Sequence, residues 1–176
     1  AFDISSEMTK IAYKRVQERG LENQAFVAQM AAEELAFPDE FADLIFGHSI
    51  LHHTDLQATR KEIYRVLKTG GRAVFLEPLN HNPLIRVFRF LTPNRRTPTE
   101  KPLRFEDVIY FVEPFSRWHH KEFYLTALAA FAFLPFQMKK LFQAVLGILG
   151  RIDNALLARW PHLGRYAWVI VLEVVK

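Results

Sequence analysis

The chain has 176 residues, of which half are hydrophobic, 16 are Phe and none is Cys. This composition is typical of one folded domain and excludes a disulfide framework or a thiolate metal site. The net charge of +4, from 23 basic and 19 acidic side chains, is too small and too dispersed to indicate nucleic-acid binding. No signal peptide is recognisable, and the lack of cysteine favours a cytoplasmic protein.

The first 50 residues alternate short apolar runs with one amphipathic stretch. Residues 1–4 are typical of the end of a strand, and Ser5 or Ser6 can cap the helix that follows. Residues 25–29 and 43–47 are strand candidates, and the second is apolar enough to be buried on both faces. The helix is predicted to end at Gly20 and to bury one stripe, made of Met8, Ile11, Ala12 and Val16.

A second helix is predicted after Asp55, which can cap it, and Lys68 is expected in its last turn before Gly70 and Gly71 stop it. Its expected buried stripe is Leu56, Ile63, Val66 and Leu67. Residues 72–77 then form a strand that ends at Pro78. Helices between apolar strands predict an α/β fold with a mainly parallel sheet covered on both sides.

The chain changes character after residue 78. The pattern predicts, in order, a helix from Pro83, a proline-rich loop over 92–102, a short helix over 105–111, a strand over 115–124, two strongly apolar helices over 125–134 and 137–158, and a last strand over 166–175. We treat residues 1–176 as one domain, in which residues 79–160 include a variable acceptor or lid region.

Several segments carry a recognisable order and spacing. An acidic residue, Asp3, ends the first strand, where it can either cap the next helix or accept both hydroxyls of a ribose. The run 32–45 (AEELAFPDEFADLI) follows, then the run 48–53 (HSILHH), and then the run 62–78, which ends in Glu-Pro. Over residues 1–78 this order closely resembles the class I methyltransferases that depend on S-adenosylmethionine, in the group called methyltransferase type 11.

The resemblance implies a Rossmann-like, doubly wound fold with an antiparallel last strand, preceded here by a helical insertion. It implies S-adenosylmethionine as the cofactor, with Asp3 on the ribose hydroxyls, Ala31 and Ala32 under the adenine, and His48 beside the cofactor. The family usually has Asp where this chain has Ala31, and losing that hydrogen bond costs about 1 kcal/mol. The family's first strand and its Gly-x-Gly-x-Gly turn are not in the chain, so we expect a fragment that binds the cofactor poorly alone.

Methyl transfer from a sulfonium is an in-line displacement that needs a base only if the acceptor has a proton to lose. His53, Glu77 and His81 lie near the expected strand ends, and we select His53 as the candidate base. Each of the three can instead be a packing or capping residue. A metal site is a rival interpretation, built on His48, His52, His53 and Asp55, and it requires a helix through the first two of these. His119 and His120 beside Trp118 can bind a ligand or lie on a half-exposed strand. No metal is expected.

The apolar run over 125–158 exceeds what one amphipathic helix face needs. It is interpreted either as a cap over the sheet or as a pocket for a hydrophobic acceptor, with peripheral membrane contact through the flanking Lys139, Lys140 and Arg151. The sequence thus predicts methyl transfer to a small-molecule or lipid-like acceptor by a cytoplasmic enzyme that can also contact a membrane through residues 125–158. The alternative is a non-catalytic scaffold that has kept the fold.

Overall fold

The computed structural model describes residues 1–91 and 101–176, so most of the predicted proline-rich loop lies outside the described residues. The larger sheet contains, in spatial order, β3 (Ala42–His48), β4 (Leu67–Pro78), β6 (Val169–Val175) and β5 (Arg117–Phe123). Strand β6 is antiparallel to both of its neighbours, and β3 is parallel to β4, so only the last strand of the chain runs against the others. This confirms the predicted α/β fold with an antiparallel last strand.

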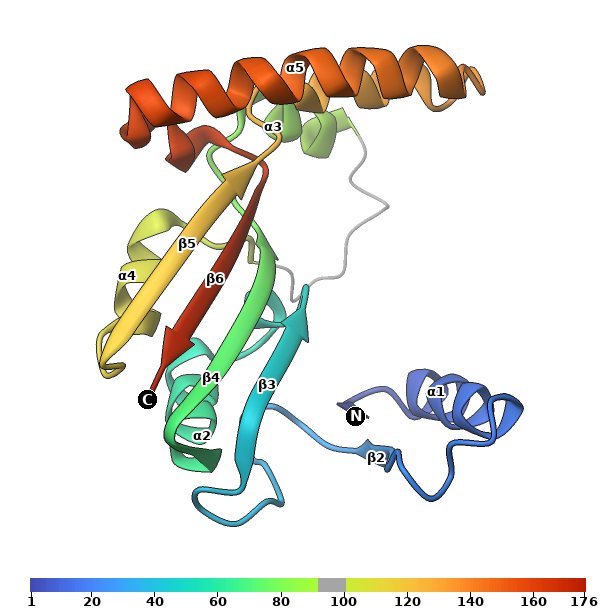
Figure 1. Ribbon diagram of the computed structural model, residues 1–176, viewed down its shortest axis with the longest axis vertical. Coiled ribbons are helices and arrows are strands. Elements are labelled where there is room, and N and C mark those ends of the chain that lie inside the picture. Colours follow the sequence, from blue (N-terminus) through green and yellow to red (C-terminus); the bar gives the residue numbers. More distant parts are fainter. Residues whose placement is uncertain (92–100) are drawn as a thin grey trace.

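The first strands form a separate small sheet. Strands β1 (Phe2–Asp3) and β2 (Ala28–Gln29) pair in parallel, and helix α1 (Ser6–Glu18) connects them. Ser5 caps α1 by accepting a hydrogen bond from the Met8 backbone at 3.3 Å, as predicted. The predicted burial of the α1 stripe is wrong, because no residue of α1 is buried. Figure 1 shows the reason: this unit extends away from the larger sheet.

Strand β3 is also less covered than its sequence predicts. Helices α2 (Leu56–Val66) and α4 (Phe105–Val112) pack against one face of the larger sheet, behind it in Figure 1. On the opposite face, Leu44 and Phe46 of β3 are exposed. The predictions that β3 is buried on both faces and that helices cover both sides of the sheet are therefore wrong for the described residues.

Helix α2 begins as predicted but ends earlier. The Asp55 carboxylate caps it by accepting a hydrogen bond from the Ala58 backbone at 2.9 Å. The helix ends at Val66 because Leu67 already has extended dihedrals and begins β4. Lys68, Gly70 and Gly71 therefore belong to the strand and not to a helix end. Gly70 has a φ of +76°, and the β3–β4 register shifts at this point, so the glycine pair permits an irregularity in the strand.

The core lies between the larger sheet and the two helices behind it. Alternate residues of β4 and β6 point into it, as the period of a strand requires. The Phe75 and Phe111 rings meet edge to face with centroids 5.4 Å apart, and both side chains are fully buried. Strand β4 is therefore tied both to its neighbours and to α4.

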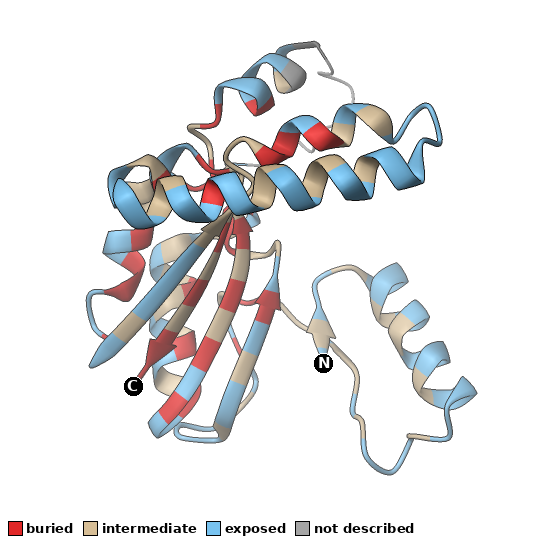
Figure 2. Ribbon diagram, turned by 45° about the horizontal axis from the view of Figure 1, so that its top comes forward, coloured by how far each residue is buried: buried red, intermediate tan, exposed pale blue. Residues whose placement is uncertain are grey.

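A layer of helices lies at the carboxyl ends of β3 and β4, where Figures 1 and 2 show it across the end of the sheet. It consists of α3 (Pro83–Leu91), the 3-10 helix η3 (Ala127–Phe133), α5 (Lys139–Arg159) and the 3-10 helix η4 (Pro161–Tyr166). The buried Asp153 of α5 accepts backbone hydrogen bonds from Leu125, Thr126 and Ala127, at 2.8 to 3.1 Å. Because these donors precede and open η3, one carboxylate both caps η3 and fixes it to α5.

Candidate functional site

The loop after β3 is anchored by a carboxylate on the neighbouring strand. Beyond His48, Ser49 takes a φ of +54° and turns the chain into the 3-10 helix η1 (Leu51–His53). Glu77, fully buried near the end of β4, accepts hydrogen bonds from the backbone N–H groups of Ile50 at 2.9 Å and Leu51 at 3.0 Å. The geometry of the loop is therefore determined by β4 as much as by its own sequence.

The same carboxylate orients a buried histidine. His52 Nδ1 lies 2.7 Å from Glu77 Oε2, and both side chains are almost completely buried. Glu77 is thus occupied by the loop and does not face solvent as a free base. The sequence contains the signal for this position, because Ala73, Phe75 and Glu77 alternate along β4 on its buried face.

A groove of about 640 Å³ lies between β1 and β3. In the part of the chain that the structure describes, β1 pairs only with β2 and β3 pairs only with β4, so both strands turn an unpaired edge toward the groove. Four of the five site residues predicted from the sequence line it: Asp3, Ala32, His48 and His53. The fifth, Ala31, precedes Ala32 in the chain but does not line the groove itself. Two separate sheets therefore contribute to one site.

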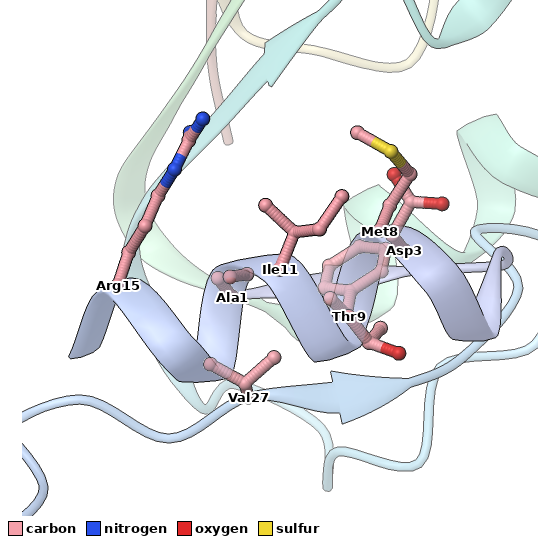
Figure 3. Close-up of a pocket in the computed structure, with 9 residues that line it drawn as sticks. Ala1, Asp3, Met8, Thr9, Ile11, Arg15 and Val27 are labelled. Atoms are coloured by element: carbon pink, nitrogen blue, oxygen red, sulfur yellow. The ribbon is translucent and has the colours of Figure 1, made fainter. Parts of the chain in front are cut away.

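Asp3 sits at the end of β1 with its carboxylate exposed. One carboxylate oxygen accepts a hydrogen bond from the Ser5 backbone at 2.8 Å, which stabilises the turn into α1. Asp3 also borders a smaller cavity of about 190 Å³, where Figure 3 shows it beside Met8 at the start of α1. Its position thus serves the turn before the helix and leaves the side chain at the rim of the larger groove.

The segment that carries Ala31 and Ala32 is fixed to α2 by ionic contacts. The Arg65 guanidinium donates hydrogen bonds to the backbone carbonyls of Leu35 and Phe37 and to the carboxylate of Glu62, at 2.8 to 2.9 Å. Glu62 in turn accepts a hydrogen bond from the Leu35 backbone at 2.8 Å. The hydrogen bond from Arg65 lowers the pKa of Glu62, and the hydrogen bonds to Glu62 and Asp39 raise the pKa of Arg65. No local signal in the sequence indicates this network, because its hydrogen bonds between the segment and α2 join residues 27 to 30 positions apart.

The three candidate bases occupy different environments. His53 is exposed in the groove, with its ring 4.0 Å from the ring of His52. Glu77 is buried under the loop, and His81 Nε2 lies 3.9 Å from a carboxylate oxygen of Glu106. Of these three described side chains, His53 is the one that lines the groove.

The metal interpretation lacks the geometry that it requires. His48 ends a strand, and His52 belongs to a separate 3-10 helix, so no continuous helix joins them. Within residues 1–91 and 101–176, no group of three or more His, Asp or Glu side chains is arranged to hold a metal ion. His119 and His120 lie in β5, where the Trp118 and His120 rings stack at 5.2 Å.

Comparisons with known proteins agree with this arrangement. Residues 1–75 match the family model described as a methyltransferase domain. The ubiquinone/menaquinone biosynthesis C-methyltransferase UbiE of Psychromonas ingrahamii is 35% identical over 96 residues, which are 52% of this chain and 38% of that protein. The uncharacterized methyltransferase YcgJ of Bacillus subtilis is 38% identical over 76 residues, 43% of this chain and 30% of that protein. The matched part of the chain thus spans about a third of the length of these relatives.

Solved structures show the same fold over almost the whole chain. A methyltransferase from Thermotoga maritima, described as a possible histamine N-methyltransferase, has a TM-score of 0.65 and 16% identity and covers 99% of this chain, which covers 72% of it. Phosphoethanolamine N-methyltransferase 2 of Haemonchus contortus, solved with S-adenosyl-L-methionine, has a TM-score of 0.66 and 19% identity. The match covers 99% of this chain and 42% of that protein. The fold is that of the class I S-adenosylmethionine-dependent methyltransferases. The match of residues 1–75 to a methyltransferase-domain model and the shared fold confirm the resemblance drawn from the sequence.

Proposed function

We propose that the full-length protein binds S-adenosylmethionine in the groove between β1 and β3 and transfers its methyl group to a small-molecule or lipid-like acceptor. The single observation that carries the proposal is that Asp3, Ala32, His48 and His53, selected from the sequence, line this one groove. In open α/β sheets, ligands bind at the carboxyl ends of the strands, and Asp3 and His48 end β1 and β3.

The groove residues suit the adenosine half of the cofactor. The exposed Asp3 carboxylate can accept hydrogen bonds from ribose hydroxyls while one of its oxygens also holds the Ser5 backbone. Ala32 offers an apolar surface to the adenine, on a segment that Arg65 fixes in place. The two unpaired strand edges favour a further parallel strand between β1 and β3, because backbone N–H and C=O groups that are buried without a hydrogen-bond partner destabilise the fold. We propose that the full-length protein supplies that strand.

The cofactor, when bound, supplies a methyl group on a positively charged sulfur. The chain's own residues then have to position the acceptor and exclude water, which the helical layer at the strand ends favours. Where the acceptor loses a proton, the exposed His53 imidazole in the groove is the group placed to accept it. The names of similar proteins support a small-molecule acceptor. One sequence relative is named for methylation in ubiquinone/menaquinone biosynthesis, and one structural neighbour is named for phosphoethanolamine.

The cofactor site is tested by calorimetric titration of the full-length protein with S-adenosylmethionine. Asp3→Ala is expected to weaken binding by about 10- to 100-fold, since charge-assisted hydrogen bonds contribute about 1.5–3 kcal/mol. Asp43→Ala is the matched control, because Asp43 is an exposed aspartate on β3 outside the groove. If Asp3→Ala lowers only the melting temperature and leaves the affinity unchanged, Asp3 is a turn residue and the proposed ribose contact is wrong.

The proposed base is tested separately by kinetics. His53→Gln is expected to lower kcat for an acceptor that loses a proton, and to leave the affinity for S-adenosylmethionine within about twofold. The pH profile of kcat in this variant should then lack the titration step that the His53 imidazole causes in the wild type. An unchanged kcat and pH profile would leave His53 as a surface residue of the groove.

A further inference from the structure

The helical layer exposes many large apolar side chains. On α3 these are Leu84, Val87 and Phe90; on the segment after η3 they are Leu134, Phe136 and Met138; and on α5 they are Leu141, Ile148 and Ile152. We call these nine residues the apolar end face. Phe90 is 82% exposed and Phe136 is 73% exposed. Exposed aromatic side chains gathered at one end of a domain mark an interaction surface more often than an ordinary solvated one.

Helix α5 has two apolar sides, and η3 packs against one of them. On the inner side, the Phe142 ring meets the Phe131 ring of η3 edge to face at 5.4 Å, and Asp153 holds the backbone that opens η3. On the outer side, Leu141, Ile148 and Ile152 follow one another at helical spacing and are exposed. A helix with apolar residues on both sides is stabilised when its outer side is also removed from water, by lipid or by another protein surface.

By length and composition the 21-residue α5 could cross a membrane, since an 18-residue stretch of it has a mean hydropathy of 1.4. Its contacts favour a different placement. The buried Asp153 accepts four hydrogen bonds from residues 125–127, and Figure 2 shows η3 alongside α5. Because one side of α5 is fixed to the domain, lipid can reach only the outer side. The helix is therefore suited to lie along a membrane surface.

The charges around the apolar end face have a single sign. Six basic residues lie on α3 and α5: Arg86, Arg89, Lys139, Lys140, Arg151 and Arg159. The sequence of α3, of residues 127–138 and of α5 contains one acidic residue, Asp153, and it is buried against the residues that open η3. Basic side chains beside exposed apolar ones are the combination that binds anionic lipid. A protein partner or a second copy of the chain would not require one sign of charge.

We propose that the apolar end face rests on the surface of a bilayer that contains anionic lipid, with α5 parallel to the membrane plane. The outer apolar side chains enter the boundary between headgroups and acyl chains, and Lys140 and Arg151 contact the anionic headgroups. The groove lies below this face, at the carboxyl ends of the strands. The proposal goes beyond methyl transfer, because it needs neither the cofactor nor an acceptor.

The test is co-sedimentation of the full-length protein with vesicles of phosphatidylcholine alone and of an equal mixture with phosphatidylglycerol. Binding is expected to the mixed vesicles and to fall with added salt. Ile148→Asp/Ile152→Asp should abolish it, and Lys140→Glu/Arg151→Glu should weaken it by more than about tenfold, since each basic residue near the surface contributes about fivefold. The matched controls are Ile109→Asp, an equally exposed isoleucine on α4, and Lys10→Glu/Lys61→Glu, which change lysines on α1 and α2.

Each result separates the proposal from its alternatives. All variants should keep the wild-type melting temperature, because the changed side chains are exposed. Failure of the wild type to bind mixed vesicles, or equal loss in the control variants, overturns the proposal. If Ile148→Asp/Ile152→Asp instead converts a dimer to a monomer in analytical ultracentrifugation without any vesicle binding, the face is an interface between copies. Calorimetric titration with S-adenosylmethionine on the same variants should show unchanged affinity, so failure here leaves the cofactor proposal standing.

Discussion

The larger sheet and the β1–α1–β2 unit bury their apolar side chains to very different extents. In the larger sheet, Phe75, Ile170 and Leu172 are fully buried between neighbouring strands and the helices behind them. In the N-terminal unit no residue of α1 is buried, and Ile4 and Ile11 are exposed. Both units contain regular strands, so the difference lies in the packing and not in the local conformation.

The uncovered surfaces of the two units face the same groove. Ile4 lines it from the end of β1, and Leu44 and Phe46 line it from β3, whose outer edge is unpaired. A strand between them would pair both edges at once and place its own side chains beside these three. The contrast thus indicates that the β1–α1–β2 unit and the outer edge of β3 lack packing partners among the described residues.

The contrast predicts the largest difference in stability for two alanine substitutions, one in the larger sheet and one in α1. In the 176-residue chain, Phe75→Ala is expected to lower the free energy of unfolding by about 3–5 kcal/mol, because it removes a fully buried ring that packs on Phe111. Ile11→Ala, on the exposed side of α1, should change it by about 0.5 kcal/mol or less. Urea unfolding followed by circular dichroism measures both.

In the full-length protein the comparison becomes sharper. If a further strand and its helix cover the N-terminal unit, Ile11→Ala should then cost about 2–4 kcal/mol, as for other buried isoleucines. A cost that remains near zero in the full-length protein would mean that α1 is a solvated helix, and the proposed strand would have to leave it uncovered.

Local signals in the sequence determined much of the fold. The caps at Ser5 and Asp55, the helix opened by Pro83 and the β-branched last strand were each predicted, because capping and strand periodicity depend on neighbouring residues. The burial of apolar side chains by segments distant in the sequence was not predictable in the same way. The exposure of Leu44 and Phe46 depends on which other segments lie beside β3, and an apolar strand has the same sequence pattern whether or not its neighbours are present.

The candidate site shows the same division. Asp3, Ala32 and His48 were selected from the family resemblance and His53 from its place near the strand ends, and all four line one groove. The contact between Glu77 and His52 joins residues 25 positions apart, so only the pairing of β3 with β4 brings it about. The sequence analysis placed Glu77 among the candidate bases at the strand ends, whereas the structure places its carboxylate inward, on the loop after β3.

A second prediction concerns the attachment of the helical layer. Asp153→Ala is expected to lower the free energy of unfolding by about 2–4 kcal/mol, because it leaves the buried Ala127 N–H, the part-buried N–H groups of Leu125 and Thr126 and the Thr126 hydroxyl without their acceptor. Asp153→Asn, which keeps one acceptor oxygen, should recover part of this loss. Thermal unfolding of both variants gives the measurement. Equal stability of the wild type and Asp153→Ala would show that α5 is held by its apolar contacts alone.

A third prediction concerns the loop that carries His48 and His53. Glu77→Gln places an amide where a carboxylate now accepts hydrogen bonds from Ile50, Leu51 and His52. The NH2 group that replaces one carboxylate oxygen can only donate, so it faces backbone N–H donors without an acceptor, at a cost of about 1–3 kcal/mol. The affinity of the full-length protein for S-adenosylmethionine should fall as well, since the loop borders the groove. An affinity equal to that of the wild type, measured on a folded variant, would separate the loop from the cofactor site.

The smallest expected effect is a pH dependence in β5, far from the N-terminal unit. The hydrogen bond from His120 to Glu122 raises the pKa of His120 above its ordinary value of about 6.5. Because the folded state holds the proton more tightly than the unfolded state, the ion pair stabilises the fold fully below the ordinary pKa and loses this effect as the pH rises through the raised value. The wild type should therefore lose more stability than Glu122→Gln as the pH rises from about 6 through the raised pKa of His120. Thermal unfolding across this range, with an NMR titration of the His120 imidazole, measures the difference. Parallel stability curves for the two proteins would mean that the pair is too solvated to affect the fold, and that β5 is stabilised by its pairing with β6 alone.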